Sequence, residues 1–399
     1  MGSVSIYFYA GDFADVLRRH AEGRQQIYQT HDEVARLIHE LLAANYKVNF
    51  YSFVTPEYRV ERPLNGFRFV SLGAKNYLTP SLLKNAVAED DAEVIVAHFP
   101  NMELLNAVAA SRARSMAILA NSYNRTGVRS FFGKYKVVRL LNSPRFELVS
   151  NHCIPATEHL AHIGVKREKL IAWDIPHPFF PTAGSSKKFT HRQRFEAVYA
   201  GSIIEGKGIT DLIRALSLLR KEGLEVHCSL AGLGDIDAMQ AFAAELGVSE
   251  LLSFVKLIGN PEVFRMMKEA DLVVVPSRTE YAEGFPLTMF EAIASLTPIV
   301  CSDHPMFRSV MRDGQNASVF RAGDYRAFAT AIRRTLTDPV LYAALSANAI
   351  ATWKALQGPA DWRTMIVKWV TEGPSSQWIR QHMLSSVELT ASLPSYESA

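Results

Sequence analysis

Three charged side chains in the second half of the chain could bind an activated substrate with an anionic group, because of their residue types and their sequence surroundings. Glu283 and Glu291 lie eight positions apart, the first beside Gly284 in a loop-like segment and the second in an apolar, helix-like stretch. Lys207 has a glycine on each side, which allows the backbone to approach a ligand closely. An ammonium in such a turn suits a phosphate or a diphosphate. Glutamate pairs at this spacing arise often by chance, so the elements around them decide what they mean.

These elements indicate an anion site. Residues 272–275 read LVVV, which predicts a buried strand that ends where Pro276 would remove a ladder donor. A loop follows, and a helix is expected from about Pro286 to Ser295, with the proline as its first residue. A strand, a loop and a helix start in this order direct free N–H groups and the positive end of the helix dipole toward the edge of the sheet.

The stretch from Ala270 to Val300 resembles the donor-sugar signature of the retaining glycosyltransferases of family 4, an E-x7-E motif after a strand that ends in Pro-Ser. The resemblance implies that Glu283 lies by the donor sugar and that Glu291 holds the ribose of the nucleotide. It also places a lysine of the family at Lys207, on the diphosphate. Where the family usually has an arginine, this chain has Ser202. Either Lys207 and the helix amides suffice, or Arg278 supplies the second positive charge.

The resemblance covers most of the second half strongly and the first half loosely, and it implies a metal-independent reaction without a cofactor. The catalytic residues expected are His98, Glu283 and Lys207. The donor-binding residues expected are Gly201, Ser202, Lys207, Ile258, Arg278, Gly284, Phe285, Pro286, Leu287 and Glu291. Ile258 lies where the family frames the nucleobase with backbone atoms, so the identity of the base is not legible, and a UDP-sugar is expected by analogy.

His98 ends a predicted buried strand within residues 92–101, in the sequence HFPN. A histidine at a strand end is more often a packed or hydrogen-bonded core residue than a catalytic one. Its setting resembles the H-x-P-N strand end of lipid-directed members of family 4, which implies a histidine that reaches the donor sugar. Asn101, together with Gly11 after the first strand, is expected on the acceptor side. The family usually has a glycine pair after that strand, whereas here a polar segment separates Gly11 from Gly23.

Residues 112–145 hold eight lysines and arginines and no acidic residue, with apolar residues interleaved. Three interpretations stay open: a face that rests on an anionic membrane, a helix packed on its own sheet with a solvated basic side, or a site for an acidic acceptor. The first and third would use Arg129, Lys134, Lys136 and Arg139. No nucleic-acid-binding motif accompanies the charge, so nucleic acid is not an expected partner.

Composition agrees with a globular enzyme. The chain has 399 residues, 48% hydrophobic and 21% charged, with a net charge of +3, and this length favours two domains. We find no apolar stretch of membrane-spanning length and no signal sequence. Three dispersed cysteines in apolar surroundings are typical of reduced thiols. These features predict a cytoplasmic protein, with peripheral contact to the inner face of the membrane under the first interpretation above.

Alternating strands and helices, twice over, predict a GT-B architecture of two Rossmann-like, doubly wound α/β domains facing a central cleft. The expected domains are an acceptor-binding domain over 1–180, a linker over 181–194 and a nucleotide-sugar-binding domain over 195–359. C-terminal helices over 360–390 are expected to cross back to the first domain.

The function expected is a retaining, metal-independent transfer of a hexosyl group from a nucleotide diphosphate sugar to a hydroxyl of a glycan or lipid-linked glycan, in cell-envelope or exopolysaccharide biosynthesis. The same architecture hosts nucleotide-sugar epimerases and phosphorylases. The E-x7-E motif with Lys207 argues against an epimerase, and the short chain argues against a phosphorylase. A non-catalytic nucleotide-sugar-binding or partner-binding subunit is the other alternative, and Ser202 is the residue that favours it.

Overall fold

The structure is a computed structural model that describes residues 2–386 except 25–28, 75–79, 121–127, 183, 185, 256–257, 282, 309 and 359. It divides into two compact units. The first unit contains the chain up to Pro176 and returns at Gly358, and the second contains His177–Gln357. The tract expected as a linker therefore groups with the second unit, and the residues expected to cross back group with the first.

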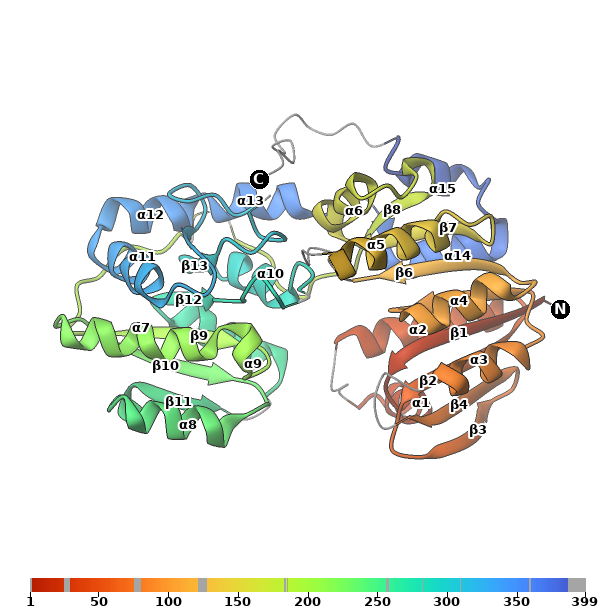
Figure 1. Cartoon of the computed structure of the whole chain (residues 1–399), viewed down its shortest axis with the longest axis horizontal. Helices are drawn as coiled ribbons and strands as arrows, with labels where there is room; N and C mark the ends of the chain where they lie inside the picture. The colour runs from red at the N-terminus through yellow and green to blue at the C-terminus, as the bar shows by residue number, and fades with distance from the viewer. Residues whose placement is uncertain are drawn as a thin grey trace. The chain divides into compact units, whose positions relative to one another are not determined.

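The first unit is built on a sheet with the strand order β15-β8-β7-β6-β5-β1-β2-β4-β3. Its strands are β1 (Gly2–Ala10), β2 (Tyr46–Val54), β3 (Tyr58–Leu64), β4 (Phe67–Ala74), β5 (Val94–His98), β6 (Arg114–Leu119), β7 (Phe146–His152), β8 (Leu170–Asp174) and β15 (Ala360–Asp361). Neighbouring strands pair in parallel except for β3, which is antiparallel to β4. Figure 1 shows β1 to β8 in red to yellow-green, with the blue C-terminal helix α14 (Trp362–Glu372) in the same unit.

The remaining helices of this unit are α1 (Phe13–Ala21), α2 (Gln29–Ala43), α3 (Pro80–Ala88), α4 (Met102–Ala110), α5 (Val128–Leu141), α6 (Cys153–His162), the 3-10 turn η1 (Arg167–Lys169) and α15 (Gln377–His382). All five residues of β5 are buried, as expected for a parallel strand covered on both faces. Helix α2 has one apolar face, because Val34, Leu37, Ile38 and Leu41 are all buried.

Two features of the first unit differ from expectation. The polar segment after Gly11 contains α1, whose start is capped by Asp12 through a 3.1 Å hydrogen bond from the Asp15 N–H. The arginines of α1 make the segment polar in sequence and conceal the helix. Its apolar residues Phe13 and Leu17 are buried. Strand β3 was also missed, because an edge strand with alternating exposure lacks a continuous apolar run.

The second unit has an all-parallel sheet with the order β11-β10-β9-β12-β13-β14. Its strands are β9 (Arg194–Ala200), β10 (Glu225–Ala231), β11 (Leu252–Val255), β12 (Leu272–Val275), β13 (Ile299–Ser302) and β14 (Ser318–Phe320). Its helical elements are η2 (Glu205–Lys207), α7 (Ile209–Lys221), α8 (Ile236–Glu245), η3 (Ser249–Leu251), α9 (Asn260–Glu269), α10 (Leu287–Ala294), α11 (Tyr325–Thr337), α12 (Pro339–Ala347) and α13 (Ala349–Leu356).

The strand order of the second unit reverses between β9 and β12. From β9 the chain first adds β10 and β11 on one side, and it then returns to place β12, β13 and β14 on the other. Loops at the carboxyl ends of the two strands at such a switch point leave a crevice, which is where ligands bind in doubly wound sheets. The loops after β9 and β12 hold most of the donor-binding residues expected from the sequence.

Candidate active site

Glycines bring the loops after β9, β10 and β12 into backbone contact. Gly208 has φ +78°, and a Cβ there would overlap the carbonyl of Pro276 at the end of β12. Gly232, after β10, has φ +156°, and a Cβ there would overlap the carbonyl of Gly201. Both positions therefore need glycine for conformation and for space. The close packing fixes the η2 loop against the loop that carries Glu283.

Lys207 and Glu283 form an ion pair at this place. The Lys207 ammonium lies 2.6 Å and 2.8 Å from the two carboxylate oxygens of Glu283, and the exposed fractions of the two side chains are 14% and 8%. The Ser277 hydroxyl donates to Glu283 at 2.8 Å, and the Lys207 ammonium lies 4.7 Å from the centre of the Tyr281 ring. Two residues expected in one site are thus in direct contact, although neither one is free.

A histidine that the sequence did not single out supports this loop. The Tyr281 carbonyl accepts the N–H of Glu283 at 2.8 Å and lies 3.1 Å from Nε2 of His304, which is fully buried. Nδ1 of His304 accepts the Met306 N–H at 3.2 Å, so Nε2 carries the hydrogen and donates to Tyr281. Burial lowers the pKa of His304, which favours this neutral form. The sequence DHPMF after β13 gave no signal, because only the fold brings His304 to Tyr281.

Arg278, one of the two alternatives for the second positive charge, is paired with carboxylates in the structure. Its guanidinium donates to both carboxylate oxygens of Asp211, at 2.7 Å and 2.9 Å, and to Glu205 at 2.8 Å. The pKa of Arg278 is raised above its ordinary range, chiefly by the hydrogen bonds to Asp211. Its backbone N–H also donates to Gly206 at 3.0 Å. Arg278 therefore braces the η2 loop, with its charge balanced by the buried Asp211.

The E-x7-E helix begins one residue later than expected. Pro286 is the N-cap of α10 and Leu287 its first residue, and no side chain caps the start. Phe285 is buried and packs edge-on against Phe290, with ring centres 5.3 Å apart, so its side chain belongs to the core. The first N–H groups of an α-helix have no intrahelical acceptor, and here they follow the half-buried Gly284.

Glu291 lies inside α10, as expected, and it is half-buried. Burial raises the pKa of Glu291 to about 7. A carboxyl in this state can donate as well as accept a hydrogen bond near neutral pH. That property suits a group that binds hydroxyls.

The other donor residues expected in the second unit lie around the same edge. Gly201, at φ +151°, directly follows β9, and the Ser202 carbonyl accepts the Tyr199 hydroxyl at 2.8 Å. Ile258 is half-buried and precedes α9. Strand β11 is described to Val255.

In the first unit, His98 ends β5, and its side chain is buried among aromatic rings. Its ring stacks on Phe8 with centres 4.1 Å apart, and the indole N–H of Trp362 donates to its Nε2 at 3.1 Å. Burial lowers the pKa of His98 to about 3, so the imidazole is neutral. Trp362 is a partner that spacing could not reveal, because it lies 264 positions away.

The two residues expected on the acceptor side have structural tasks. The Asn101 side-chain oxygen accepts the Leu104 N–H at 2.8 Å and caps α4. Gly11 has φ +128°, and a Cβ there would lie 2.9 Å from the ring of Phe13. These roles account for both residue types without an acceptor.

The basic segment is described in part. The side chain of Arg129 lies outside the described residues, Lys134 is half-buried, and Lys136 and Arg139 are exposed. Val137 and Leu141 of α5 are buried in the core of the unit. The described part of α5 thus uses these apolar residues to pack on its own sheet, as the second interpretation expects.

The described residues also bear on membrane, metal and thiol chemistry. None of the helices there has the length and apolar character that crossing a membrane requires. Within the same residues, no three His, Cys, Asp or Glu side chains form a group that could hold a metal ion. The three cysteines are free and buried.

Two doubly wound units of this kind define the GT-B class of fold, and solved structures agree. Sucrose-phosphate synthase from Thermosynechococcus elongatus superposes with a TM-score of 0.64 at 17% identity, over 93% of this chain and 98% of its own. HepE from Anabaena, solved in complex with UDP and glucose, gives a TM-score of 0.61 at 15% identity, over 94% and 100% of the two chains. At these identities the likeness shows the fold alone.

Sequence comparison points to the second unit. Residues 185–352 match the profile of the glycosyl transferases of group 1. Phosphatidyl-myo-inositol mannosyltransferase from Mycobacterium leprae is 31% identical over 147 residues, which is 36% of this chain and 38% of that protein. The chain spans less than half the length of the first curated relatives that it matches.

Proposed function

We propose that the protein is a retaining glycosyltransferase that moves a hexosyl group from a nucleotide diphosphate sugar, a UDP-sugar by preference, to a hydroxyl of a glycan or glycolipid. The observation that carries the proposal is the Lys207–Glu283 pair at the switch point of the second unit. It lies within the region that matches the group 1 glycosyl transferases. The choice of UDP is supported by the HepE complex, which has the same fold.

The diphosphate would take Lys207 as its cationic partner. The ammonium is already oriented by Glu283 and by the Tyr281 ring. A diphosphate entering the η2 loop would share the ammonium with Glu283, and the free N–H groups at the start of α10 would add donors. Such preorganised donors stabilise the charge that develops on a leaving group. We propose that these groups, without a metal ion, hold the leaving diphosphate.

The nucleotide and the sugar would meet the two glutamates. Glu291, with its pKa raised to about 7 by burial, would bind the ribose hydroxyls. Glu283 would orient the sugar. Its oxygens are held by Lys207 and Ser277, which makes it a poor nucleophile. We therefore propose front-face attack with retention, in which a departing phosphate oxygen accepts the proton of the acceptor hydroxyl.

The acceptor would be a glycan or a lipid-linked glycan of cell-envelope or exopolysaccharide biosynthesis. The mycobacterial relative, named for a phosphatidylinositol acceptor, supports the lipid-linked option. The exposed Lys136 and Arg139 of α5 could meet an anionic headgroup or an acidic acceptor. Because Val137 and Leu141 are used in the core, such a contact would be electrostatic and would weaken as salt is added.

The decisive experiment measures donor binding and donor hydrolysis together. Calorimetry with a panel of UDP-, GDP- and ADP-sugars is run on the wild type, on Glu291→Ala and on the exposed control Glu262→Ala. Selective binding of one nucleotide sugar, weakened about tenfold or more by Glu291→Ala and unchanged by the control, is the expected result. Absence of binding at millimolar donor, with both variants like the wild type, would refute the site.

A second candidate is a nucleotide-sugar-binding subunit without turnover. It is favoured by two observations: Ser202 stands where the family usually has an arginine, and the charge of Arg278 is balanced by Asp211. This candidate predicts selective binding in the calorimeter with no hydrolysis or transfer from any donor in the panel.

A further inference from the structure

His98 has one nitrogen with a partner and one without. Its side chain is 3% exposed, and rings of Phe8, Phe99 and Trp362 surround it at centre distances of 4.1, 4.0 and 5.5 Å. Within the described part of the chain, Nδ1 is buried and has no hydrogen-bond partner. A buried polar atom left in this state costs about 1–3 kcal/mol, so its presence needs an explanation.

The partner of Nε2 determines where the ring hydrogen lies. The indole of tryptophan can only donate a hydrogen bond. Since the Trp362 indole nitrogen lies 3.1 Å from Nε2 of His98, Nε2 must accept and carries no hydrogen. A neutral imidazole then has its hydrogen on Nδ1. The unpartnered atom of His98 is therefore an N–H donor, held in an apolar surrounding.

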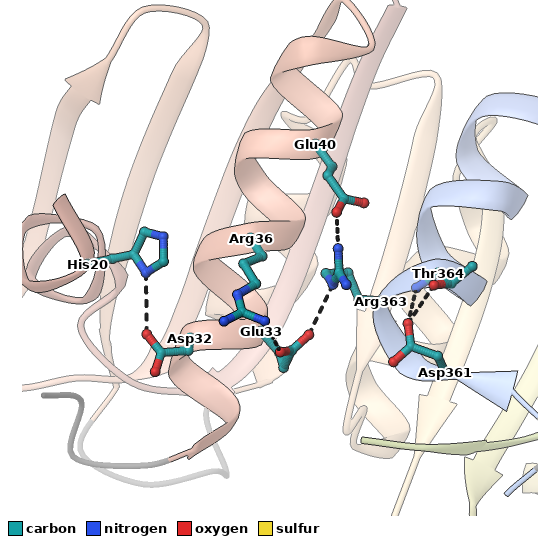
Figure 2. A network of polar contacts seen from close by, with 8 residues as sticks. All are labelled: His20, Asp32, Glu33, Arg36, Glu40, Asp361, Arg363 and Thr364. Carbon is teal, nitrogen blue, oxygen red and sulfur yellow. Dashed lines mark hydrogen bonds and ion pairs between the residues drawn. The ribbon is translucent and has the colours of Figure 1, made fainter. Parts of the chain in front are cut away.

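Trp362 is itself firmly placed, because α14 is fastened to α2 within the first unit. Figure 2 shows Arg363 between two carboxylates of α2: it donates to Glu33 at 3.0 Å and pairs with Glu40. The same view shows Asp361 at the start of α14, where its carboxylate accepts the Thr364 N–H at 2.8 Å. Trp362 follows Asp361 directly as the first residue of α14 and is buried.

We propose that Trp362 is a positioning residue that holds His98 in the neutral tautomer with its hydrogen on Nδ1. In this tautomer His98 donates a hydrogen bond to a ligand oxygen and does not accept a proton. This inference rests on the proposed function for the identity of the ligand as a sugar or its acceptor. It assigns His98 a defined chemistry. Nε2 is occupied by the indole and Nδ1 already carries a hydrogen, so neither nitrogen can act as a general base.

The tautomer is measured directly on the full chain labelled with nitrogen-15 histidine. In correlation spectra at neutral pH, a ring nitrogen without hydrogen resonates far downfield of one with hydrogen, and the His98→Asn variant assigns the signal. We expect Nδ1 protonated and Nε2 unprotonated in the wild type, and conversion to the Nε2–H tautomer in Trp362→Phe. A wild-type His98 with hydrogen on Nε2, or a Trp362→Phe variant that keeps the wild-type pattern, overturns the proposal.

Trp173→Phe is the matched control. Trp173 is also buried near His98, with ring centres 6.4 Å apart, but its indole N–H donates to the Leu119 carbonyl at 3.0 Å. The Trp173→Phe substitution removes an indole of the same size without removing the partner of Nε2 of His98, so the tautomer of His98 should be unchanged. A change of tautomer in this control would show that general repacking moves His98, and it would count against a specific role of Trp362.

The rate of donor turnover distinguishes a positioning role of Trp362 from a role in packing alone. Trp362→Phe is expected to lower donor turnover about tenfold, the value of one hydrogen bond. In a His98→Asn background, where the amide N–H replaces Nδ1–H and needs no indole, the same substitution should change turnover by no more than about twofold. Equal losses in both backgrounds contradict the proposal. If the wild type shows no turnover with any donor, the proposed function fails, while the tautomer measurement still decides this inference.

Discussion

At the scale of single residues, the site depends on charges and polar atoms whose state is set by burial. Glu291 has a raised pKa, His98 and His304 have lowered pKa values, and the main physical cause in each case is removal from water. Lys207 and Glu283 are also largely removed from water, and their opposite charges balance each other in an ion pair. Each of these states can be tested by a single substitution.

The pKa of Glu291, raised from 4.5 to about 7, makes stability depend on pH. The folded state binds the proton more tightly than the unfolded chain, so this stabilisation is fully present below about pH 4.5 and is lost as pH rises through 7. Glu291→Gln should remove the dependence and be more stable than the wild type at pH 8, by at most roughly 3 kcal/mol. Urea unfolding of both proteins at pH 5 and pH 8 measures this. Parallel stability curves would argue against a buried, uncharged Glu291.

The ion pair predicts a non-additive result. Lys207→Met leaves the Glu283 carboxylate buried and unpaired, which should cost about 3–5 kcal/mol of stability. Adding Glu283→Gln removes that charge, so the double variant should be more stable than Lys207→Met alone, although neither variant turns over donor. Chemical unfolding gives the coupling energy. A double variant less stable than Lys207→Met would mean that the pair does not exist in solution.

At the scale of elements, the site is formed by three loops that touch through glycine backbone. The strands that precede these loops, β10, β9 and β12, are neighbours in the sheet of the second unit (Figure 1). The side chains gain their positions from this contact. For that reason a methyl group in a loop should damage the site as much as the loss of a charge.

Gly208→Ala tests the effect of a methyl group in the η2 loop, because Gly208 has φ +78° and a Cβ there would overlap the Pro276 carbonyl. Gly223→Ala is the control, because Gly223 has φ +80° and a Cβ there would meet nothing within 4 Å. The control should lose about 1 kcal/mol from the left-handed conformation alone. Gly208→Ala should lose more than the control and should weaken donor binding, because the η2 loop must move away from Pro276. Thermal unfolding and calorimetry compare the two, and equal effects would show that the loops are not in contact.

The elements also show what could be predicted from sequence. Strands β5 and β12 were predicted because continuous apolar residues indicate them directly. Helix α1 was missed because nine residues rich in arginine hide a short apolar face. The candidate site residues were predicted from a motif, and the motif does not reveal which of them are in contact. Lys207 and Glu283 are 76 positions apart, and the pairing of Arg278 with Asp211 follows only from the fold.

At the scale of the whole molecule, each unit has its own core. Trp369 is fully buried in the first unit and Phe328 in the second. Each belongs to a unit with its own sheet, so the two units need not lose structure together. The division can be seen in calorimetric unfolding.

Trp369→Ala and Phe328→Ala are a matched pair for this test. Each should cost about 3–5 kcal/mol in its own unit. We expect two transitions in the wild type, with each substitution lowering the midpoint of a different one. If both substitutions shift a single transition by the same amount, the units unfold as one cooperative body.

The pairing of β15 with β8 has a consequence for how the protein is made. Among the described residues, the second unit is the continuous stretch His177–Gln357, whereas the first combines residues from before and after that stretch. Because a ribosome delivers the chain from the N-terminus, all of the second unit has been synthesised before β15 and α14 exist. The unit that begins first therefore finishes last. Until Trp362 has been synthesised, the imidazole of His98 has no indole to fix its hydrogen, so this part of the first unit stays incomplete until α14 has been added.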